Sequence, residues 1–195
     1  MNTLFSHVCV VTMDERMSVW TDAFVGVTDG KISYLSKHAP EEKPDQIIDA
    51  TGMVLMPGLI NCHTHLPMQL LRGYADDLKL QEWLNDYIFP REDRLDGRCV
   101  RAATTLAVAE CLKFGVTSVS DMYYFCDDIC DVIAKSGMKA NISRGTSMFL
   151  GDDFDFEKFP ACQELVALKN KWHNFDGGRI KIEASIHAEY TSTYQ

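Results

Sequence analysis

Beyond residue 57, short strand-like segments alternate with longer segments of helical periodicity. The strand-like segments span residues 59–62, 117–121, 139–143 and 179–186. The helical segments span residues 78–88, 96–114, 126–136 and 160–173. A chain in which strands alternate with helices builds right-handed crossovers and a parallel sheet. We therefore predict an α/β fold for residues 57–195.

The first 56 residues carry strand signals and no helical segment. The strand-like segments span residues 3–12, 19–28, 31–36, 47–50 and 53–56. Asp29-Gly30 separates the second segment from the third, and Asp-Gly is a strong signal for a two-residue hairpin turn. Residues 1–56 are therefore expected to form a small β domain, distinct from residues 57–195.

The composition excludes several kinds of partner and location. A formal net charge of −9 argues against nucleic acid or an anionic membrane surface as a partner. No stretch of about 18 apolar residues occurs, so no membrane span is expected. The seven cysteines include no Cys-x-x-Cys pair, which is typical of free thiols in a reducing compartment. The first residues lack the basic region of a signal peptide, and we expect a cytoplasmic location.

Two histidines, His63 and His65, follow the strand-like segment at residues 59–62. Residues i and i+2 of a strand point to the same side, so the two imidazoles are expected to share one space. Converging neutral imidazoles suit a divalent ion of the zinc type. The alternative is a pair of polar residues in a loop that follows a strand. Asp121, at the end of the next strand, is open to a hydrogen-bonding or a functional role.

The His-x-His segment and its neighbours resemble the amidohydrolase superfamily. The motifs that carry the resemblance are Pro57-Gly-Leu-Ile-Asn-Cys-His-Thr-His65, Leu71-Arg-Gly-Tyr-Ala-Asp-Asp-Leu78, Glu82-Trp-Leu84, Ile88-Phe-Pro-Arg-Glu92 and Ser185-Ile-His-Ala-Glu-Tyr190. Together they are similar to the branch that holds 5-methylthioadenosine/S-adenosylhomocysteine deaminases and the related chlorohydrolases. The resemblance covers nearly the whole chain.

This resemblance implies part of a composite β-sandwich, joined to the first four βα units of a distorted (β/α)8 barrel of the TIM type. It implies that His63 and His65 bind Zn²⁺ or another divalent metal such as Fe²⁺. A nucleoside-like small-molecule substrate would be contacted by Glu92, through its ribose hydroxyls, and by Arg144, His187 and Trp83.

Each of the four expected substrate contacts has a structural alternative. Glu92 could be an ordinary charge at a helix terminus, and Arg144 could belong to a surface ion pair. His187 could be a core histidine with satisfied hydrogen bonds, and Trp83 could be a core aromatic residue.

The resemblance also implies that the catalytic residues lie beyond the end of this chain. In the family, the third metal histidine, the acidic catalyst and the metal aspartate follow the fifth, sixth and eighth strands, whereas four strands are expected up to Gln195. A complete barrel takes about 250 residues. We therefore expect the N-terminal half of an enzyme, inactive alone, whose open strand edges favour self-association.

The activity that the resemblance implies is a metal-dependent hydrolytic deamination of adenosine-type substrates, with release of ammonia. One alternative is another amidohydrolase of the branch, such as a chlorohydrolase or a guanine or cytosine deaminase. Another is a non-catalytic fragment that acts in binding or assembly. Glu92 favours a ribosyl substrate.

Two departures from the family pattern bear on the substrate. Glu189 stands where the fourth-strand motif usually has a proline, which adds a charge near the expected site. The deaminases often carry a second arginine soon after the first, but here the next arginine after Arg144 is Arg179. Residues 151–157 resemble a calcium loop only faintly and are expected to form a solvated acidic loop. Recognition of an amino-acid tail is therefore not implied.

Overall fold

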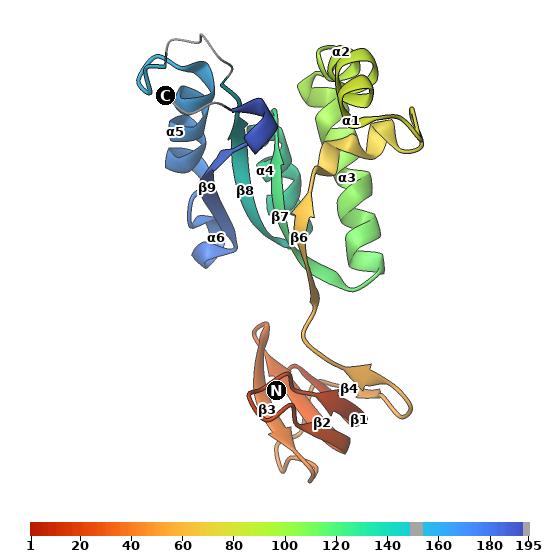
Figure 1. The fold of residues 1–195 in the computed structure, drawn as a ribbon. Coiled ribbons are helices and arrows are strands. Elements are labelled where there is room, and N and C mark those ends of the chain that lie inside the picture. Colours follow the sequence, from red (N-terminus) through yellow and green to blue (C-terminus); the bar gives the residue numbers. More distant parts are fainter. Residues whose placement is uncertain (149–153, 193–195) are drawn as a thin grey trace. The chain divides into compact units, whose positions relative to one another are not determined.

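The computed structural model describes residues 1–148 and 154–192, which form two compact units (Figure 1). Unit 1 covers residues 1–57 and unit 2 covers residues 58–195. Part of the expected acidic loop, residues 151–153, lies outside the described residues.

Unit 1 is a five-stranded sheet in the order β3-β2-β1-β4, with β5 also paired to β1. Its strands are β1 (Thr3–Val11), β2 (Val19–Thr28), β3 (Lys31–Ser36), β4 (Gln46–Asp49) and β5 (Val54–Leu55). The predicted hairpin turn is confirmed, since Asp29 and Gly30 both have positive φ angles, 50° and 73°. The parallel pairing of β4 and β5 with β1 has no signal in the sequence.

Unit 2 is built on a four-stranded parallel sheet in the order β6-β7-β8-β9. Its strands are β6 (Leu59–Thr64), β7 (Val116–Tyr123), β8 (Lys139–Thr146) and β9 (Ile180–Ile186). The crossovers contain α3 (Gly97–Lys113), α4 (Cys126–Ser136) and α5 (Pro160–Trp172) (Figure 1). This sequential parallel order confirms the α/β prediction.

The core of unit 2 lies between the sheet and these three helices. Its fully buried members include Val119, Ile142 and Ile180 from the strands and Val100 and Ile129 from the helices. Burial of such side chains is the main favourable term in folding. The core fixes the carboxyl ends of the strands, where the polar side chains of the candidate site lie.

The helix ends follow local sequence signals. The Asp96 carboxylate accepts a hydrogen bond from the backbone N–H of Cys99 at 2.8 Å and so caps the first turn of α3. Gly137, with a φ angle of 80°, ends α4 in the left-handed conformation that glycine adopts without strain.

The helix expected at residues 78–88 is interrupted. It is divided into α1 (Leu80–Glu82), a π-helical turn η2 (Trp83–Ile88) and α2 (Phe89–Glu92). Pro90 has no backbone N–H to donate to the carbonyl of Asp86, and its ring would crowd that carbonyl in a regular α-helix. The wider turn before Pro90 accommodates the proline and presents Trp83 and Glu92 from one continuous helical path.

The outer strands of the described sheet expose apolar side chains. Leu59 and Ile60 on β6 are 50% and 65% exposed, and Ile186 on β9 is 71% exposed. Within the described residues, β6 and β9 each pair with a single neighbour. In the part of the chain that the structure describes, no helix is both long and apolar enough to cross a membrane.

The end of α4 is held by one arginine from a distant part of the chain. The Arg179 guanidinium donates hydrogen bonds to the backbone carbonyls of Ile133 at 3.2 Å, Ala134 at 3.0 Å and Met138 at 2.8 Å. It also pairs with Asp176 at 2.8 Å. The last carbonyls of a helix have no hydrogen-bond partner within the helix. The Arg179 side chain, which is largely buried, supplies hydrogen bonds to two of these carbonyls.

Substitution of Arg179 by Ala should lower the free energy of unfolding by about 2–4 kcal/mol, because several charge-assisted hydrogen bonds disappear together. Urea denaturation followed by circular dichroism measures the change. The control is Lys135→Ala, which removes an exposed ion pair on the same helix and should cost less than about 0.5 kcal/mol. Equal losses in the two variants would contradict the role of Arg179.

Candidate active site

The two predicted histidines lie together where β6 ends. His63 belongs to the strand and His65 follows its last residue. Their ring centroids are 5.3 Å apart and the ring planes meet at 82°. The strand geometry therefore places the two imidazoles beside each other, as their spacing predicted.

The orientation and tautomer of His65 are set by β7. Its Nδ1 lies 2.6 Å from the backbone carbonyl oxygen of Met122. A carbonyl oxygen can only accept, so Nδ1 carries the proton and Nε2 keeps a free lone pair. A histidine that donates from one ring nitrogen and offers the other is the arrangement that metal sites use.

Asp121 anchors the chain directly after His65. One of its carboxylate oxygens accepts a hydrogen bond from the backbone N–H of Leu66 at 2.6 Å. The side chain is 1% exposed, and within the described residues its other oxygen has no hydrogen-bond partner. Burial raises the pKa of Asp121 to about 7. Of the two roles left open for Asp121, the geometry supports the hydrogen-bonding one.

Glu92, the last residue of α2, is held by Tyr123. The Tyr123 hydroxyl donates to one Glu92 carboxylate oxygen at 2.6 Å, and the Tyr123 ring lies 6.1 Å from the His65 ring. Burial raises the pKa of Glu92, and the hydrogen bond from Tyr123 opposes that shift. Glu92 is therefore a partly desolvated carboxylate. The Tyr123 hydroxyl binds only one of its two oxygens.

Four of the predicted residues line one small cavity, which we name the inner cavity. These residues are His65, Trp83, Glu92 and His187. They come from three separate segments of the chain, because Trp83 and Glu92 share one helical segment. Tyr123 and Tyr190 also line the cavity. The sequence motifs therefore converge in space.

His187, just beyond β9, offers a free ring nitrogen. Its Nδ1 lies 2.8 Å from the hydroxyl oxygen of Thr191, whose own proton is donated to the carbonyl of Ala188 at 3.1 Å. The Thr191 oxygen must therefore accept from Nδ1, which leaves Nε2 as an acceptor. Burial, with a smaller contribution from His65, lowers the pKa of His187 and favours the neutral ring.

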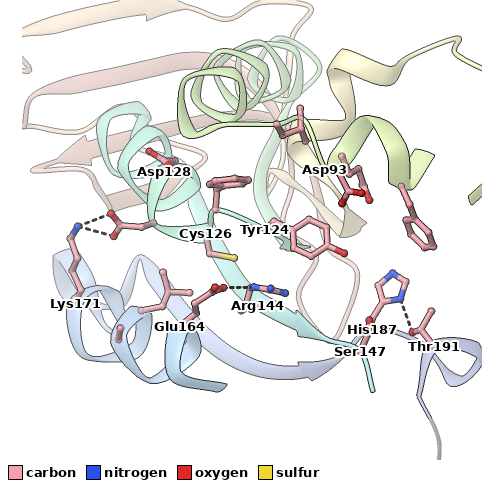
Figure 2. Close-up of a pocket in the computed structure, with 17 residues that line it drawn as sticks. Asp93, Tyr124, Cys126, Asp128, Arg144, Ser147, Glu164, Lys171, His187 and Thr191 are labelled. Atoms are coloured by element: carbon pink, nitrogen blue, oxygen red, sulfur yellow. Dashed lines mark hydrogen bonds and ion pairs between the residues drawn. The ribbon is translucent and has the colours of Figure 1, made fainter. Parts of the chain in front are cut away.

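Arg144 lines a second, larger cavity of about 980 Å³, which we name the outer cavity (Figure 2). The outer cavity shares Glu92 and His187 with the inner one. Arg144 Nε donates to Glu164 at 2.6 Å, and its guanidinium carbon lies 4.7 Å from the centroid of the Tyr124 ring. Arg144 therefore forms an ion pair, which was its alternative role, and also lines a cavity.

Other predicted features lie outside the two cavities. Glu189, which replaces the usual proline, is exposed in the short 3₁₀ turn η3 (Glu189–Thr191) and lines neither cavity. His63 is exposed beside His65. In residues 1–148 and 154–192, no group of three or more His, Cys, Asp or Glu side chains is arranged to hold a metal.

Tyr123, Tyr124 and Glu164 belong to the two cavities but were not predicted from the sequence. Tyr123 and Tyr124 lie at the carboxyl end of β7, the edge where barrels place site residues, and this was the only available signal. Glu164 lies on α5 without any motif. Its contact with Arg144 arises from the packing of α5 beside β8.

A sequence model described as the amidohydrolase family matches residues 54–195. The chain belongs to this family, which confirms the resemblance seen in its motifs.

Individual relatives are considerably longer than this chain. The 5-methylthioadenosine/S-adenosylhomocysteine deaminase of Thermoanaerobacter pseudethanolicus is 35% identical over 191 residues, which is 98% of this chain and 44% of the relative. The 5'-deoxyadenosine deaminase of Methanosphaera stadtmanae is 38% identical over 172 residues, covering 87% and 39%. The chain therefore spans less than half the length of these relatives.

Solved structures have the same fold. An adenosine deaminase from Xanthomonas campestris with bound zinc superposes with a TM-score of 0.84 at 31% identity, over 97% of this chain and 44% of that one. The atrazine chlorohydrolase TrzN of Arthrobacter aurescens, complexed with zinc, gives 0.81 at 21% identity over 94% and 46%. The second likeness shows the fold alone.

Substitution of Tyr123 by Phe should raise the pKa of Glu92 further, because the hydroxyl that favours the ionised carboxylate is removed. Carboxyl carbon shifts followed by NMR through a pH titration measure this pKa. Tyr34→Phe, which removes a tyrosine hydroxyl from unit 1, is the matched control and should leave it unchanged. A Glu92 pKa that stays constant or falls in Tyr123→Phe would show that the hydrogen bond does not stabilise the carboxylate.

Proposed function

We propose that this chain supplies metal-binding and substrate-binding residues of a hydrolytic deaminase that acts on adenosine-type nucleosides and releases ammonia. The observation that carries the proposal is the convergence of His65, Trp83, Glu92 and His187 on the inner cavity. The names of the relatives that are 35% and 38% identical support the same reaction class. Substrates such as 5-methylthioadenosine, S-adenosylhomocysteine and 5'-deoxyadenosine share an adenosine core.

The donor chemistry of His63 and His65 fits a divalent metal. The rings converge, and the hydrogen bond to Met122 leaves the Nε2 lone pair of His65 available. We assign these residues to the site of Zn²⁺ or another divalent ion such as Fe²⁺, and zinc in the structure of the Xanthomonas campestris relative supports this choice. When bound, the metal supplies a Lewis acid that activates water near neutral pH.

The other side chains bind and orient the nucleoside. The Glu92 carboxylate accepts hydrogen bonds from the ribose hydroxyls, with Tyr123 holding it from behind. His187 accepts a hydrogen bond at Nε2, and the Trp83 ring packs against the nucleoside. Such positioning brings the amine-bearing carbon of the base toward His65, where water attacks and ammonia leaves. No residue of the described part of the chain is assigned to proton transfer.

The half-buried Glu92 carboxylate favours nucleosides over free bases and triazines. A carboxylate that is partly desolvated and held by Tyr123 gains most from a partner that donates hydrogen bonds, and ribose hydroxyls are such donors. The triazine hydrolase structures, at 20–22% identity, support the fold and not the substrate.

Deamination of 5-methylthioadenosine and 5'-deoxyadenosine should be detectable by ammonia release from the longest polypeptide that carries this sequence. Chelation should abolish the activity and added zinc should restore it. His65→Ala should lower kcat/KM by at least about 100-fold, because a metal ligand is lost.

The control for this experiment is His38→Ala, which changes an exposed histidine of unit 1 and should leave the activity unchanged. Turnover of guanine, cytosine or a chlorotriazine without turnover of any nucleoside would contradict the proposal. So would full activity in the His65→Ala variant.

We also propose that the 195-residue chain by itself self-associates with a second copy through the edges of its parallel sheet. Exposed backbone edges with apolar side chains are templates for pairing with another chain. Ile60→Glu on β6 should shift sedimentation velocity profiles toward monomer, whereas Ile32→Glu, at a 70% exposed position of unit 1, should not. A monomer at high protein concentration would refute this proposal.

A further inference from the structure

The outer cavity continues from the inner cavity in a direction away from the histidine pair. Both cavities are lined by Glu92 and His187, but His65 lines only the inner one. A nucleoside with its base toward His65 and its ribose at Glu92 therefore directs its 5′ substituent into the outer cavity. This placement rests on the proposed function. The named relatives act on adenosines that differ in this substituent, so the chemistry of the outer cavity bears on the choice among them.

Carboxylates outnumber cations among the described residues that line the outer cavity. The carboxylates are Glu92, Asp93, Asp127, Asp128 and Glu164, and the cations are Arg144 and Lys171 (Figure 2). Both cations already have partners. Lys171 Nζ lies 2.7 Å and 2.9 Å from the two carboxylate oxygens of Asp127, and Arg144 pairs with Glu164. Asp128 pairs with Arg101, which lies outside the lining.

Arg144 is the side chain that would otherwise attract an anion, and three contacts occupy it. Its Nε donates to Glu164 at 2.6 Å, and one terminal nitrogen donates to the carbonyl of Gly145. The ring of Tyr124 covers one face of the guanidinium at 4.7 Å. The arginine side chain is only 16% exposed. An incoming carboxylate would have to displace Glu164 or lie beside it, and like charges side by side are unfavourable.

We propose that the outer cavity receives the 5′ substituent and that Glu164, by pairing with Arg144, determines its specificity. Uncharged and cationic substituents are accepted, and anionic substituents are rejected. The arginine, its charge balanced by Glu164, then serves as a planar wall beside Tyr124 rather than as a receptor for a carboxylate. Among adenosine-type substrates, this favours a methylthio, methyl or aminomethyl end over an acidic one.

The test compares three nucleosides that differ in charge at the 5′ position. They are 5′-methylthioadenosine, 5′-amino-5′-deoxyadenosine and adenosine-5′-carboxylate, assayed by ammonia release from the longest polypeptide that carries this sequence. We expect kcat/KM for adenosine-5′-carboxylate to lie at least about tenfold below the values for the other two nucleosides, because the negative charge of Glu164 repels the 5′ carboxylate. High salt should narrow the gap, because exposed charges are screened.

Glu164→Gln should raise the ratio of kcat/KM for the carboxylate to that for the methylthio nucleoside by about fivefold or more, because Arg144 is released. Glu157→Gln removes the same charge from an exposed residue outside the cavity lining and should leave the ratio unchanged. If Glu164→Gln does not fold, Glu164→Ala removes the same ion pair with Arg144 and serves in the same comparison.

The possible failures are distinguishable. If none of the nucleosides is deaminated, the proposed function fails and the inference fails with it. If 5′-methylthioadenosine is deaminated and the carboxylate is used equally well, only the inference is overturned. A ratio that is the same in Glu164→Gln and the unmodified protein would likewise remove Glu164 as the determinant.

Discussion

The hydrogen bond between His65 Nδ1 and the carbonyl oxygen of Met122, at 2.6 Å, is the contact on which the candidate site depends. It joins the ends of two neighbouring parallel strands and fixes which imidazole nitrogen remains free. The residues on either side of Met122 also position parts of the site. Asp121 accepts a hydrogen bond from the backbone N–H of Leu66, directly after His65, and the Tyr123 hydroxyl donates one to Glu92. Three consecutive residues of β7 therefore orient the side chains that we propose for metal binding and for substrate binding. Strand geometry makes this possible. Asp121 and Tyr123, two residues apart, point to the same face of the sheet, and the backbone carbonyl of Met122 lies between them.

The segment that carries Trp83 and Glu92 reaches the site because a proline interrupts it. A regular helix across residues 80–92 would crowd the Pro90 ring against a carbonyl one turn earlier. The π-helical turn accommodates Pro90 and keeps Trp83 and Glu92 on the wall of one cavity. Wide helical turns of this kind are frequent at functional sites. Here the irregularity has an identifiable cause and an identifiable effect on the position of two side chains.

Much of unit 2 could be predicted from the sequence, because the features involved are local or periodic. The strand–helix alternation gave the parallel sheet, and the spacing of His63 and His65 gave their convergence. The motif resemblance pointed to Glu92, whose environment the structure then revealed. What could not be predicted depends on contacts between distant segments. The role of the Met122 carbonyl leaves no trace in side-chain identity, and Glu164 meets Arg144 only because α5 packs beside β8. The same reason explains why the parallel pairing of β4 and β5 with β1 was not foreseen.

The Arg179 contacts with α4 have a consequence for how the chain acquires its structure during synthesis. The carbonyls at the end of α4 find their partner 41 to 46 residues further along the chain. While the polypeptide is being made, this helix end remains hydrated until α5 and the start of β9 have left the ribosome. The last turn of α4 is therefore completed late, after a long loop has closed. Until Arg179 has been synthesised, the carbonyls of Ile133 and Ala134 lack this hydrogen-bond partner.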